Sequence, residues 1–324
     1  MLLGTHTSGD EKNFLQVATV NLPNPETEID ARKFDEEKQE CGGFGGVNGK
    51  VEIKIKIPHD GEVNRARYMP QNSFIVATKT PSSDVFVFDV SKHPSTPEPD
   101  AECCPEHRCT GHTEEGYGIC WSPHKEGMLL SGSDDKTVCL WDIGSGGETV
   151  NSLDIRSGHT DVVEDVSWHG FSEHRFGSVG DDKQLLIWDV REGSDKTKAQ
   201  SIVKDAHDGD VNSLSFCPHN EFLLVTAGGD RAVKLWDMRN LKAPQHVFEG
   251  HKKEVYVVEW CADKNCKTIM ASCAADRRVN VWDISRIGQE QAPEDAEDGP
   301  PELLFIHGAC ALRSLTARGR THGG

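Results

Sequence analysis

The sequence has no long apolar run, no closely spaced cysteine pair of the metal-binding kind and few basic residues. No segment approaches the roughly 18 consecutive apolar residues of a membrane-spanning helix. The opening stretch MLLGTHTSGDEKN has no sustained apolar core, so we expect no signal peptide. The 11 cysteines include no Cys-x-x-Cys pair, which leaves a zinc site and a disulfide framework without support. We therefore expect free thiols, a reducing compartment, no metal and no cofactor.

Basic residues are scarce relative to acidic ones. The chain of 324 residues has 35 lysines and arginines against 53 aspartates and glutamates, a formal net charge of −18. Such acidity disfavours binding to nucleic-acid phosphates and to acidic membranes, and it favours basic protein partners. The alternative is that the charge only keeps the protein soluble. We expect no direct nucleic-acid binding and no membrane association.

One pattern recurs along the chain at nearly fixed spacing. A histidine, a hydroxyl residue, an aspartate and a tryptophan appear four times, with the aspartate six residues before the tryptophan and the hydroxyl four before the aspartate. The four sets are His112, Ser131, Asp135 and Trp141; His159, Ser178, Asp182 and Trp188; His207, Thr226, Asp230 and Trp236; and His251, Ser272, Asp276 and Trp282. A fifth copy with two substitutions precedes them: His59, Thr78, Ser82 and Phe88.

Serine, histidine and aspartate together fit two kinds of network. One is nucleophilic catalysis, which would make the chain a hydrolase acting through a residue such as Ser131 or Ser178. The other is structural, a buried set in which indole, hydroxyl, imidazole and carboxylate satisfy one another inside each repeat. An enzyme builds one active constellation, whereas a structural network is rebuilt in every unit of an array. The repetition favours structural tetrads of the WD-repeat kind, with no catalytic residue and no enzyme.

The spacing of the repeats also predicts the fold. Successive repeat histidines, from His59 to His251, are 53, 47, 48 and 44 residues apart, so the chain is one array rather than the two domains that length alone suggests. Short β-branched and apolar runs bounded by Gly, Pro, Asp and Asn are typical of strands joined by turns. The stretch before each histidine supplies an outer strand, which gives four strands in a blade.

The predicted fold is an all-β WD-repeat β-propeller over residues 1–308. It has five recognisable units, which start near His59, His112, His159, His207 and His251, and one further strand-like run at 14–22. These units do not obviously close a ring, so we expect an incomplete one. Residues 309–324 show no strand pattern, and we expect them to form an unrelated, disordered tail.

Residues just after each repeat histidine enter the innermost strand and are expected near the mouth of the central channel. Every unit has a carboxylate three or five residues after its histidine. Five carboxylates around one opening suit an extended peptide rich in Lys or Arg. The alternative is that they are solvated loop carboxylates of an acidic chain. The candidate residues of this top face are Glu62, Glu115, Tyr117, Glu164, Asp210, Asn212, Glu254 and Tyr256.

A second candidate site lies in the acidic segment 294–301 and the apolar run that follows it. Acidic residues beside apolar ones could receive an amphipathic basic helix. The alternative, which periodicity favours, is an exposed acidic linker followed by a buried strand. The residues in question are Asp295, Asp298, Phe305 and Ile306.

Several stretches resemble one family: GEVNRARYMPQN, ATKTPSSDVFVFD, GHTEEGYGICWSP, LSGSDDKTVCLWDI, DRRVNVWDISRIG and PEDAEDGPPELLFIHG. They are similar to the retinoblastoma-binding histone chaperones, which include the small subunit of chromatin assembly factor, from about Thr5 to Gly308. The resemblance implies a nuclear seven-bladed propeller, with a cytoplasmic pool also compatible. It implies that the protein escorts histones H3 and H4 and serves in chromatin assembly, deacetylase, remodelling and Polycomb complexes.

The resemblance also assigns roles to particular residues. The histone H3 tail and other basic peptides are expected on the top face, where Glu115, Glu164, Asp210 and Glu254 match the family's positions. The first helix of histone H4 is expected in a side groove, of which Asp295, Asp298, Phe305 and Ile306 match the loop half.

The chain departs from that family at both ends. The family's long N-terminal helix has no counterpart, and ACALRSLTARGRTHGG stands where a final blade is expected. A truncated isoform or an incomplete gene model is the plainest explanation, and a non-functional truncated isoform stays one alternative. Another is a substrate-receptor adaptor of a ubiquitin ligase, since WD propellers of many functions share the tetrad.

Overall fold

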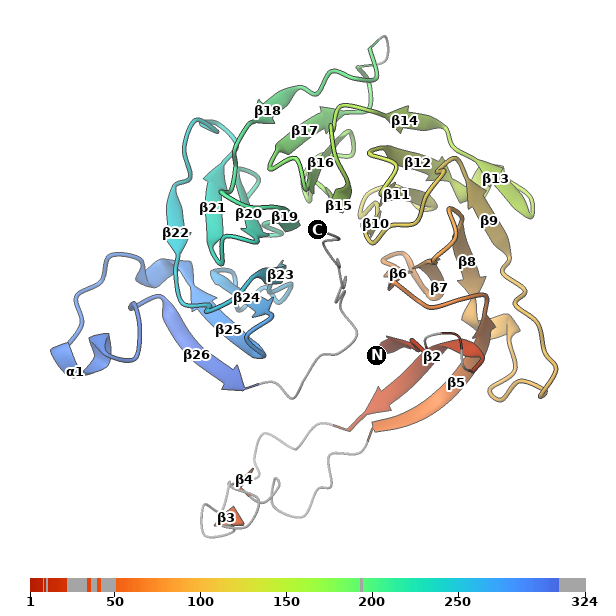
Figure 1. Cartoon of the computed structure of the whole chain (residues 1–324), viewed down its shortest axis with the longest axis horizontal. Helices are drawn as coiled ribbons and strands as arrows, with labels where there is room; N and C mark the ends of the chain where they lie inside the picture. Colours follow the sequence, from red (N-terminus) through yellow and green to blue (C-terminus); the bar gives the residue numbers. More distant parts are fainter. Residues whose placement is uncertain are drawn as a thin grey trace, which may run out of the picture.

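In the described residues, six sheets of three to five strands are arranged around a central axis (Figure 1), and their strands are antiparallel except for one parallel pair in the second sheet. A computed structural model describes residues 1–7, 9, 11–21, 34–35, 40–41, 51–192 and 195–308. Four sheets have four strands each, one has five and the first has three. The predicted all-β WD-repeat propeller is confirmed, whereas the described residues give six sheets and not the seven blades that the family resemblance implied.

The sheets follow one another around the ring in chain order. The first sheet holds β1 (Leu2–Gly4), β2 (Asn13–Val20) and β5 (Val51–His59), and the second holds β6 (Arg65–Met69), β7 (Asn72–Lys79), β8 (Val85–Asp89), β9 (His107–Thr110) and β13 (Thr149–Asn151). The third comprises β10 (Ile119–Trp121), β11 (Met128–Gly132), β12 (Val138–Asp142) and β14 (Asp154–Arg156), and the fourth β15 (Val163–Trp168), β16 (Arg175–Gly180), β17 (Leu185–Asp189) and β18 (Ser201–Val203). The last two are β19 (Val211–Phe216), β20 (Leu223–Gly228), β21 (Val233–Asp237) and β22 (His246–Phe248), then β23 (Val255–Trp260), β24 (Ile269–Ala274), β25 (Arg278–Asp283) and β26 (Leu303–Gly308).

Few other elements are present. Two-residue strands β3 (Phe34–Asp35) and β4 (Glu40–Cys41) pair with each other, and α1 (Pro293–Ala296) is a single helical turn in the acidic segment. Three short 3-10 turns, η2 (Val90–Lys92), η3 (Ile143–Ser145) and η4 (Ile284–Arg286), follow strands β8, β12 and β25. No helix in the described part of the chain is long and apolar enough to cross a membrane. The predicted tail at 309–324 lies outside the described residues.

The turn between the second and third strands of four blades has the same construction. A basic residue in each turn adopts the left-handed conformation, with φ between 63° and 70° at Lys136, Lys183, Arg231 and Arg277. The aspartate just before it accepts a hydrogen bond from the backbone N–H two residues on, as Asp135 does from Thr137 (2.9 Å). Equivalent bonds are made by Asp182, Asp230 and Asp276. The aspartate of the repeat therefore offsets the cost of positive φ at a residue with a side chain.

The outer strand of each blade comes from the start of the next repeat. Strand β9, which directly precedes His112, pairs with β8 of the previous unit, and β22, which precedes His251, pairs with β21. Each blade thus takes strands from two consecutive repeats, so that neighbouring blades share covalent connections. This interlocking is a property of the assembled ring, and it refines the sequence-based expectation of four strands in a unit.

Neighbouring blades are joined by apolar clusters and by side chains that reach across to the next blade. Val179 and Leu185 of the fourth sheet, for example, pack with Val211 and Phe216 of the fifth. Histidines in the loops after the inner strands approach backbone carbonyls of the following blade: His124 Nε2 and His169 O are 3.1 Å apart, and His219 Nε2 and Cys261 O are 2.9 Å apart. Burial and directed hydrogen bonds together fix the angle between blades.

The ring is open between the last sheet and the first. Figure 1 shows β26 and the sheet β1–β2–β5 separated, with no further strand of the described residues between them. Residues on one face of the last sheet, such as Val257, Ala271 and Val281, are consequently half-exposed, and Phe305 is 58% exposed. The expectation of a buried strand after the acidic segment is therefore wrong: β26 pairs with β25, but its side chains lack a covering blade.

Candidate functional site

The predicted top-face residues all lie where the chain enters an inner strand. The inner strands β6, β10, β15, β19 and β23 begin at Arg65, Ile119, Val163, Val211 and Val255 and surround the centre of the ring (Figure 1). Strands that run in the same direction in successive blades bring their first residues to one rim of the propeller. We call five carboxylates at these strand entries the acidic rim: Glu62, Glu115, Glu164, Asp210 and Glu254.

Polar contacts order part of the acidic rim. The side-chain amide of Asn64 donates to Glu115 of the next unit (3.1 Å), which joins two neighbouring strand entries. The amide of Asn212 donates to the carbonyl of Val255 (2.8 Å), again across adjacent blades. These amides hold the rim together.

Two further rim carboxylates have local partners. The hydroxyl of Tyr256 donates to Glu254 (3.4 Å). The His6 imidazole pairs with Glu62, so that the first residues of the chain reach the rim. The rim is therefore a set of carboxylates partly held by neighbouring polar groups.

Exposure differs around the rim. Asp210 and Glu254 are exposed, whereas Glu62, Glu115, Tyr117 and Glu164 are half-buried. In the part of the chain that the structure describes, neither Asp210 nor Glu254 forms an ion pair with Lys or Arg. A cationic ligand would meet carboxylates that are accessible on one side of the rim and partly desolvated on the other, which strengthens their attraction.

Just inside the rim, an ion pair crosses the channel. The guanidinium of Arg65 on β6 lies 2.8 Å from the carboxylate of Asp165 on β15, and both side chains are almost buried. Asp165 also accepts hydrogen bonds from the Ser213 hydroxyl (2.9 Å) and the Leu214 backbone (3.2 Å) of β19. These residues line a small cavity of about 100 Å³. Sequence reasoning missed this network, because a lone Arg and a lone Asp 100 residues apart carry no pattern.

Three of the four tetrads form a continuous hydrogen-bond chain. In the unit of Trp188 the indole N–H donates to Ser178 Oγ (2.8 Å), the Ser178 hydroxyl lies 2.7 Å from His159 Nε2, and His159 Nδ1 lies 3.0 Å from Asp182. The same chain occurs with Trp236, Thr226, His207 and Asp230, and with Trp282, Ser272, His251 and Asp276. Because the indole N–H can only donate, the hydroxyl oxygen accepts from it and donates its own O–H to Nε2 of the imidazole. The Nδ1–H of the imidazole in turn donates to the carboxylate.

The tetrad environment does not suit catalysis. Ser178 is fully buried and already accepts from one ring and donates to another, so no substrate atom can reach its oxygen. Burial lowers the pKa of His207 and of His251 despite their aspartate partners. Burial opposes ionisation of Asp182, yet the hydrogen bond from His159 leaves the pKa of this carboxyl lowered. Neutral imidazole and ionised carboxylate are the states that such a structural chain requires.

The unit of His112 departs from this pattern. The indole of Trp141 donates to the carbonyl of Thr110 (2.9 Å), the Ser131 hydroxyl to that of Gly132 (3.3 Å), and His112 Nε2 has no partner in the described part of the chain. His112 Nδ1 keeps its contact with Asp135 (3.0 Å). The expected chain from tryptophan to aspartate is therefore interrupted at the serine.

A buried lysine lies next to this interrupted tetrad. Lys79, at the end of β7, is fully buried, and its Nζ has no hydrogen-bond partner among the described residues. Burial lowers the pKa of Lys79 to about 8, against the attraction of Cys139 and Asp135 of the next blade. The position aligns with Gly132, Val179, Ala227 and Cys273 in the other units, so a charge here replaces a small or apolar side chain.

The degenerate unit uses other partners. His59 Nε2 lies 2.9 Å from the Thr78 hydroxyl, as in a full tetrad, but His59 Nδ1 approaches the carbonyl of Gly61 (2.9 Å). Ser82 contacts Thr80 (2.6 Å) rather than the histidine, and the Phe88 ring packs near His59 with no polar bond. A backbone carbonyl thus takes the place of the missing aspartate.

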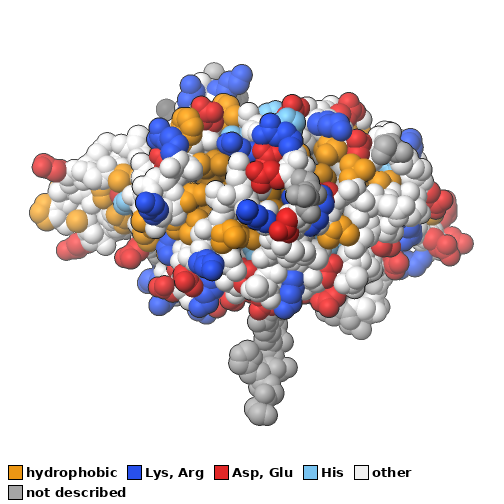
Figure 2. Space-filling model, turned by 90° about the horizontal axis from the view of Figure 1, so that it is seen from above, with side chains coloured by type: hydrophobic (Ala, Val, Ile, Leu, Met, Phe, Trp, Pro, Cys, Tyr) orange, Lys and Arg blue, Asp and Glu red, His pale blue; other side chains and the backbone are white. Residues whose placement is uncertain are grey.

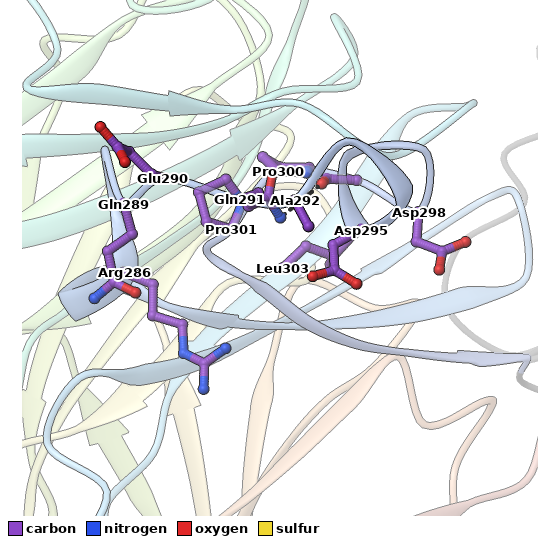
Figure 3. A pocket seen from close by; sticks show the side chains of 11 residues that line it. Arg286, Gln289, Glu290, Gln291, Ala292, Asp295, Asp298, Pro300, Pro301 and Leu303 are labelled. Carbon is purple, nitrogen blue, oxygen red and sulfur yellow. Dashed lines mark hydrogen bonds between the residues drawn. The ribbon is translucent and has the colours of Figure 1, made fainter.

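The acidic segment borders a separate pocket. A cavity of about 360 Å³ is lined by residues of the segment 286–303, among them Asp295, Asp298, Pro300, Pro301 and Leu303. Figure 3 shows Asp295 beside Leu303, with Asp298 at the edge and its carboxylate turned outward. The amide of Gln291 closes the loop on itself by donating to Gly299 O (3.2 Å).

Two of the four predicted groove residues stay outside this pocket. Phe305 and Ile306 lie on β26 and are exposed, but they do not line the cavity. The sequence-based set therefore divides into two acidic residues at a pocket and two apolar residues on the neighbouring strand.

Figure 2, an edge-on view of the ring, shows acidic and basic side chains interspersed over the visible face. No three His, Cys, Asp or Glu side chains within the described ranges are grouped so as to hold a metal ion.

Comparison with known families agrees with the repeat geometry. The family described as WD domain, G-beta repeat (WD40) matches residues 103–142, 147–189, 199–237 and 242–283, about half of the chain. Each matched segment ends one residue after the tryptophan of a tetrad, and the degenerate unit at His59 is not among them. Propellers of this family typically act as non-enzymatic scaffolds for other proteins. The chain belongs to the WD40 repeat family.

Proposed function

We propose that the protein is a non-enzymatic histone-binding scaffold whose acidic rim takes a Lys- or Arg-rich peptide such as the histone H3 tail. The observation that carries the proposal is the position of the five rim carboxylates, one at each of five successive inner-strand entries. A peptide laid across the rim would place its cations near carboxylates whose field is focused at the channel mouth.

The rim geometry favours an extended peptide over a folded domain. The ion pair of Arg65 with Asp165 lies just inside the rim, and a ligand that lies over the mouth can follow the successive carboxylates without entering the channel. Tyr117 and Tyr256 are half-buried beside the carboxylates, where their rings can pack against the aliphatic part of a lysine or arginine side chain.

The wider role follows from the same family resemblance. We infer a nuclear subunit of chromatin assembly, deacetylase, remodelling or Polycomb-type complexes, with histones H3 and H4 as partners and no need of a cofactor. The acidic net charge of −18 supports a basic partner. The ubiquitin-ligase adaptor stays the alternative, and affinity purification that recovers ligase subunits without histones would favour it.

The rim is tested by charge reversal. Glu164→Lys and Asp210→Lys are each expected to weaken binding of a fluorescent histone H3 tail peptide, by roughly 2–5 kcal/mol if the pairs are desolvated. Glu126→Lys is the matched control, because Glu126 is exposed in the loop at the other end of β10. Affinity should also fall as salt rises, since the Debye length is about 8 Å at physiological ionic strength. Unchanged affinity in both rim variants would contradict the proposal.

A further inference from the structure

The hairpin loop between β23 and β24 brings two cysteines together. Cys261 directly follows β23, and Cys266 lies in the same loop. Both are tied to Ile269: the N–H of Cys261 donates to Ile269 O (2.9 Å), and the N–H of Ile269 donates to Cys266 O (3.2 Å). A turn at Asp263, whose carbonyl accepts the N–H of Cys266 (3.0 Å), folds the loop back between them. The thiol of Cys266 consequently lies beside that of Cys261 and interacts with it.

This pair differs from the cysteines of the strands. Cys109 and Cys139 are buried, and burial raises the pKa of both thiols to about 12. Burial likewise raises the pKa of Cys120 to about 11. Such thiols are almost never ionised near neutral pH, so they behave as apolar packing groups. Cys261 and Cys266 are only half-buried, on a loop at the edge of the ring.

We propose that Cys261 and Cys266 form a redox modification site, a dithiol that closes into an intraloop disulfide by exchange with a small disulfide such as glutathione disulfide. One of the two cysteine thiolates attacks one sulfur of glutathione disulfide, forms a mixed disulfide and releases one glutathione thiolate. The other cysteine thiolate then attacks the protein sulfur of this mixed disulfide, forms the intraloop S–S bond and releases the second glutathione. Two protein thiols are oxidised, one glutathione disulfide is reduced to two thiols, and the two cysteine protons pass to the glutathione sulfurs.

The attacking group in thiol exchange is the thiolate. Burial and then the neighbouring sulfur of Cys261 raise the pKa of the Cys266 thiol. Both steps therefore accelerate as pH rises.

The site lies at a contact between blades. The carbonyl of Cys261 is the group that His219 of the preceding blade approaches (2.9 Å). An intraloop disulfide would cross-link the loop next to this contact and leave the backbone bonds to Ile269 in place. The two cysteines are not part of the acidic rim, so the test of this proposal does not depend on the proposed function.

The disulfide can be detected directly in the full-length protein. Trypsin cuts after Lys253, Lys264 and Lys267, so an intraloop disulfide joins peptide 254–264 to peptide 265–267. We expect this linked pair after incubation in glutathione buffers of increasing oxidised fraction, followed by alkylation and mass spectrometry, and we expect excess reduced glutathione to remove it. The yield should rise between pH 7 and pH 8.5.

Two variants remove one thiol each. Cys266→Ser and Cys261→Ser should each abolish the linked pair and trap glutathione on the loop thiol that remains. Cys104→Ser, at an exposed cysteine beside the half-buried Cys103, is the control and should leave the linked pair unchanged. The proposal is overturned if both loop thiols carry separate glutathione adducts with no linked pair, or if they stay free under conditions that modify Cys104.

Discussion

Arg65 and Asp165 meet 2.8 Å apart inside the channel although one blade lies between the blades of their strands. The same carboxylate accepts bonds from Ser213 and Leu214, so groups from three blades converge on one oxygen pair. Because both charges are nearly buried, each depends on the other for compensation. The contact links non-adjacent blades of an open ring.

Removing one member of this pair should destabilise the ring. Arg65→Met leaves the Asp165 carboxylate buried without its cation, which costs roughly 3–5 kcal/mol. The double variant Arg65→Met with Asp165→Asn should recover much of that loss, because no uncompensated charge remains. Urea unfolding followed by tryptophan fluorescence measures both. A single variant as stable as the parent would show that the pair contributes nothing.

Lys79→Met should stabilise the protein. Burial lowers the pKa of Lys79 from its usual 10.5 to about 8, so its charged form is disfavoured in the folded state. Stability is therefore complete above the unfolded pKa and is lost as pH falls through about 8. The methionine variant should gain roughly 3 kcal/mol at pH 7 and about half of that at pH 9.5.

Unfolding midpoints of parent and variant at the two pH values test this prediction. Lys136→Met, at an exposed lysine in the turn of the next blade, is the matched control and should show no gain that depends on pH. A destabilised Lys79→Met variant would mean that the ammonium has a stabilising partner in solution.

Trp188→Ala should destabilise the propeller without removing any chemical step. Deleting the indole leaves a cavity and removes the hydrogen bond that Ser178 Oγ accepts, together roughly 3–5 kcal/mol. Trp188→Phe keeps most of the volume and loses only the N–H, so it should cost about 1–2 kcal/mol. Thermal and chemical unfolding measure the difference. A serine-directed covalent probe should label neither Ser131 nor Ser178, and labelling of either would contradict the structural interpretation.

Binding of the first helix of histone H4 should be weak or absent. Helix-in-groove binding needs apolar walls on both sides, and among the residues that the structure describes the acidic pocket and the exposed Phe305 and Ile306 form one such wall. Losing half of the buried apolar area removes several kcal/mol at about 25 cal/mol per Å², and each 1.4 kcal/mol or so is tenfold in affinity. The carboxylates of Asp295 and Asp298 would still attract a basic helix loosely.

Titration of a labelled H4 helix peptide measures its affinity for this protein and for a version that carries a family-type N-terminal helix. The version with the added helix should bind at least tenfold more tightly. Equal and tight binding of the H4 peptide by both proteins would show that the groove does not need the helix. The H3 tail is the control and should bind both proteins equally.

Local patterns in the sequence determined the blades and most of the tetrads. The strand periodicity, the turn residues and the fixed spacing of His159, Ser178, Asp182 and Trp188 depend on residues within one repeat, whose geometry is nearly the same in every unit. The positions of the acidic rim could be predicted for the same reason, since an offset of three or five residues from the histidine places each carboxylate at a strand entry.

Contacts between repeats were decided only by the tertiary structure. Arg65 and Asp165 are 100 residues apart, and Lys79 is buried beside the tetrad of the next blade, whose expected chain is broken at Ser131. The exposure of Phe305 depends on the open side of the ring. The proximity of Cys261 and Cys266 depends instead on backbone bonds to Ile269 within one hairpin loop. Spacing along a chain specifies what each blade contains, whereas the packing of one blade on another determines which charges are buried and which faces stay open.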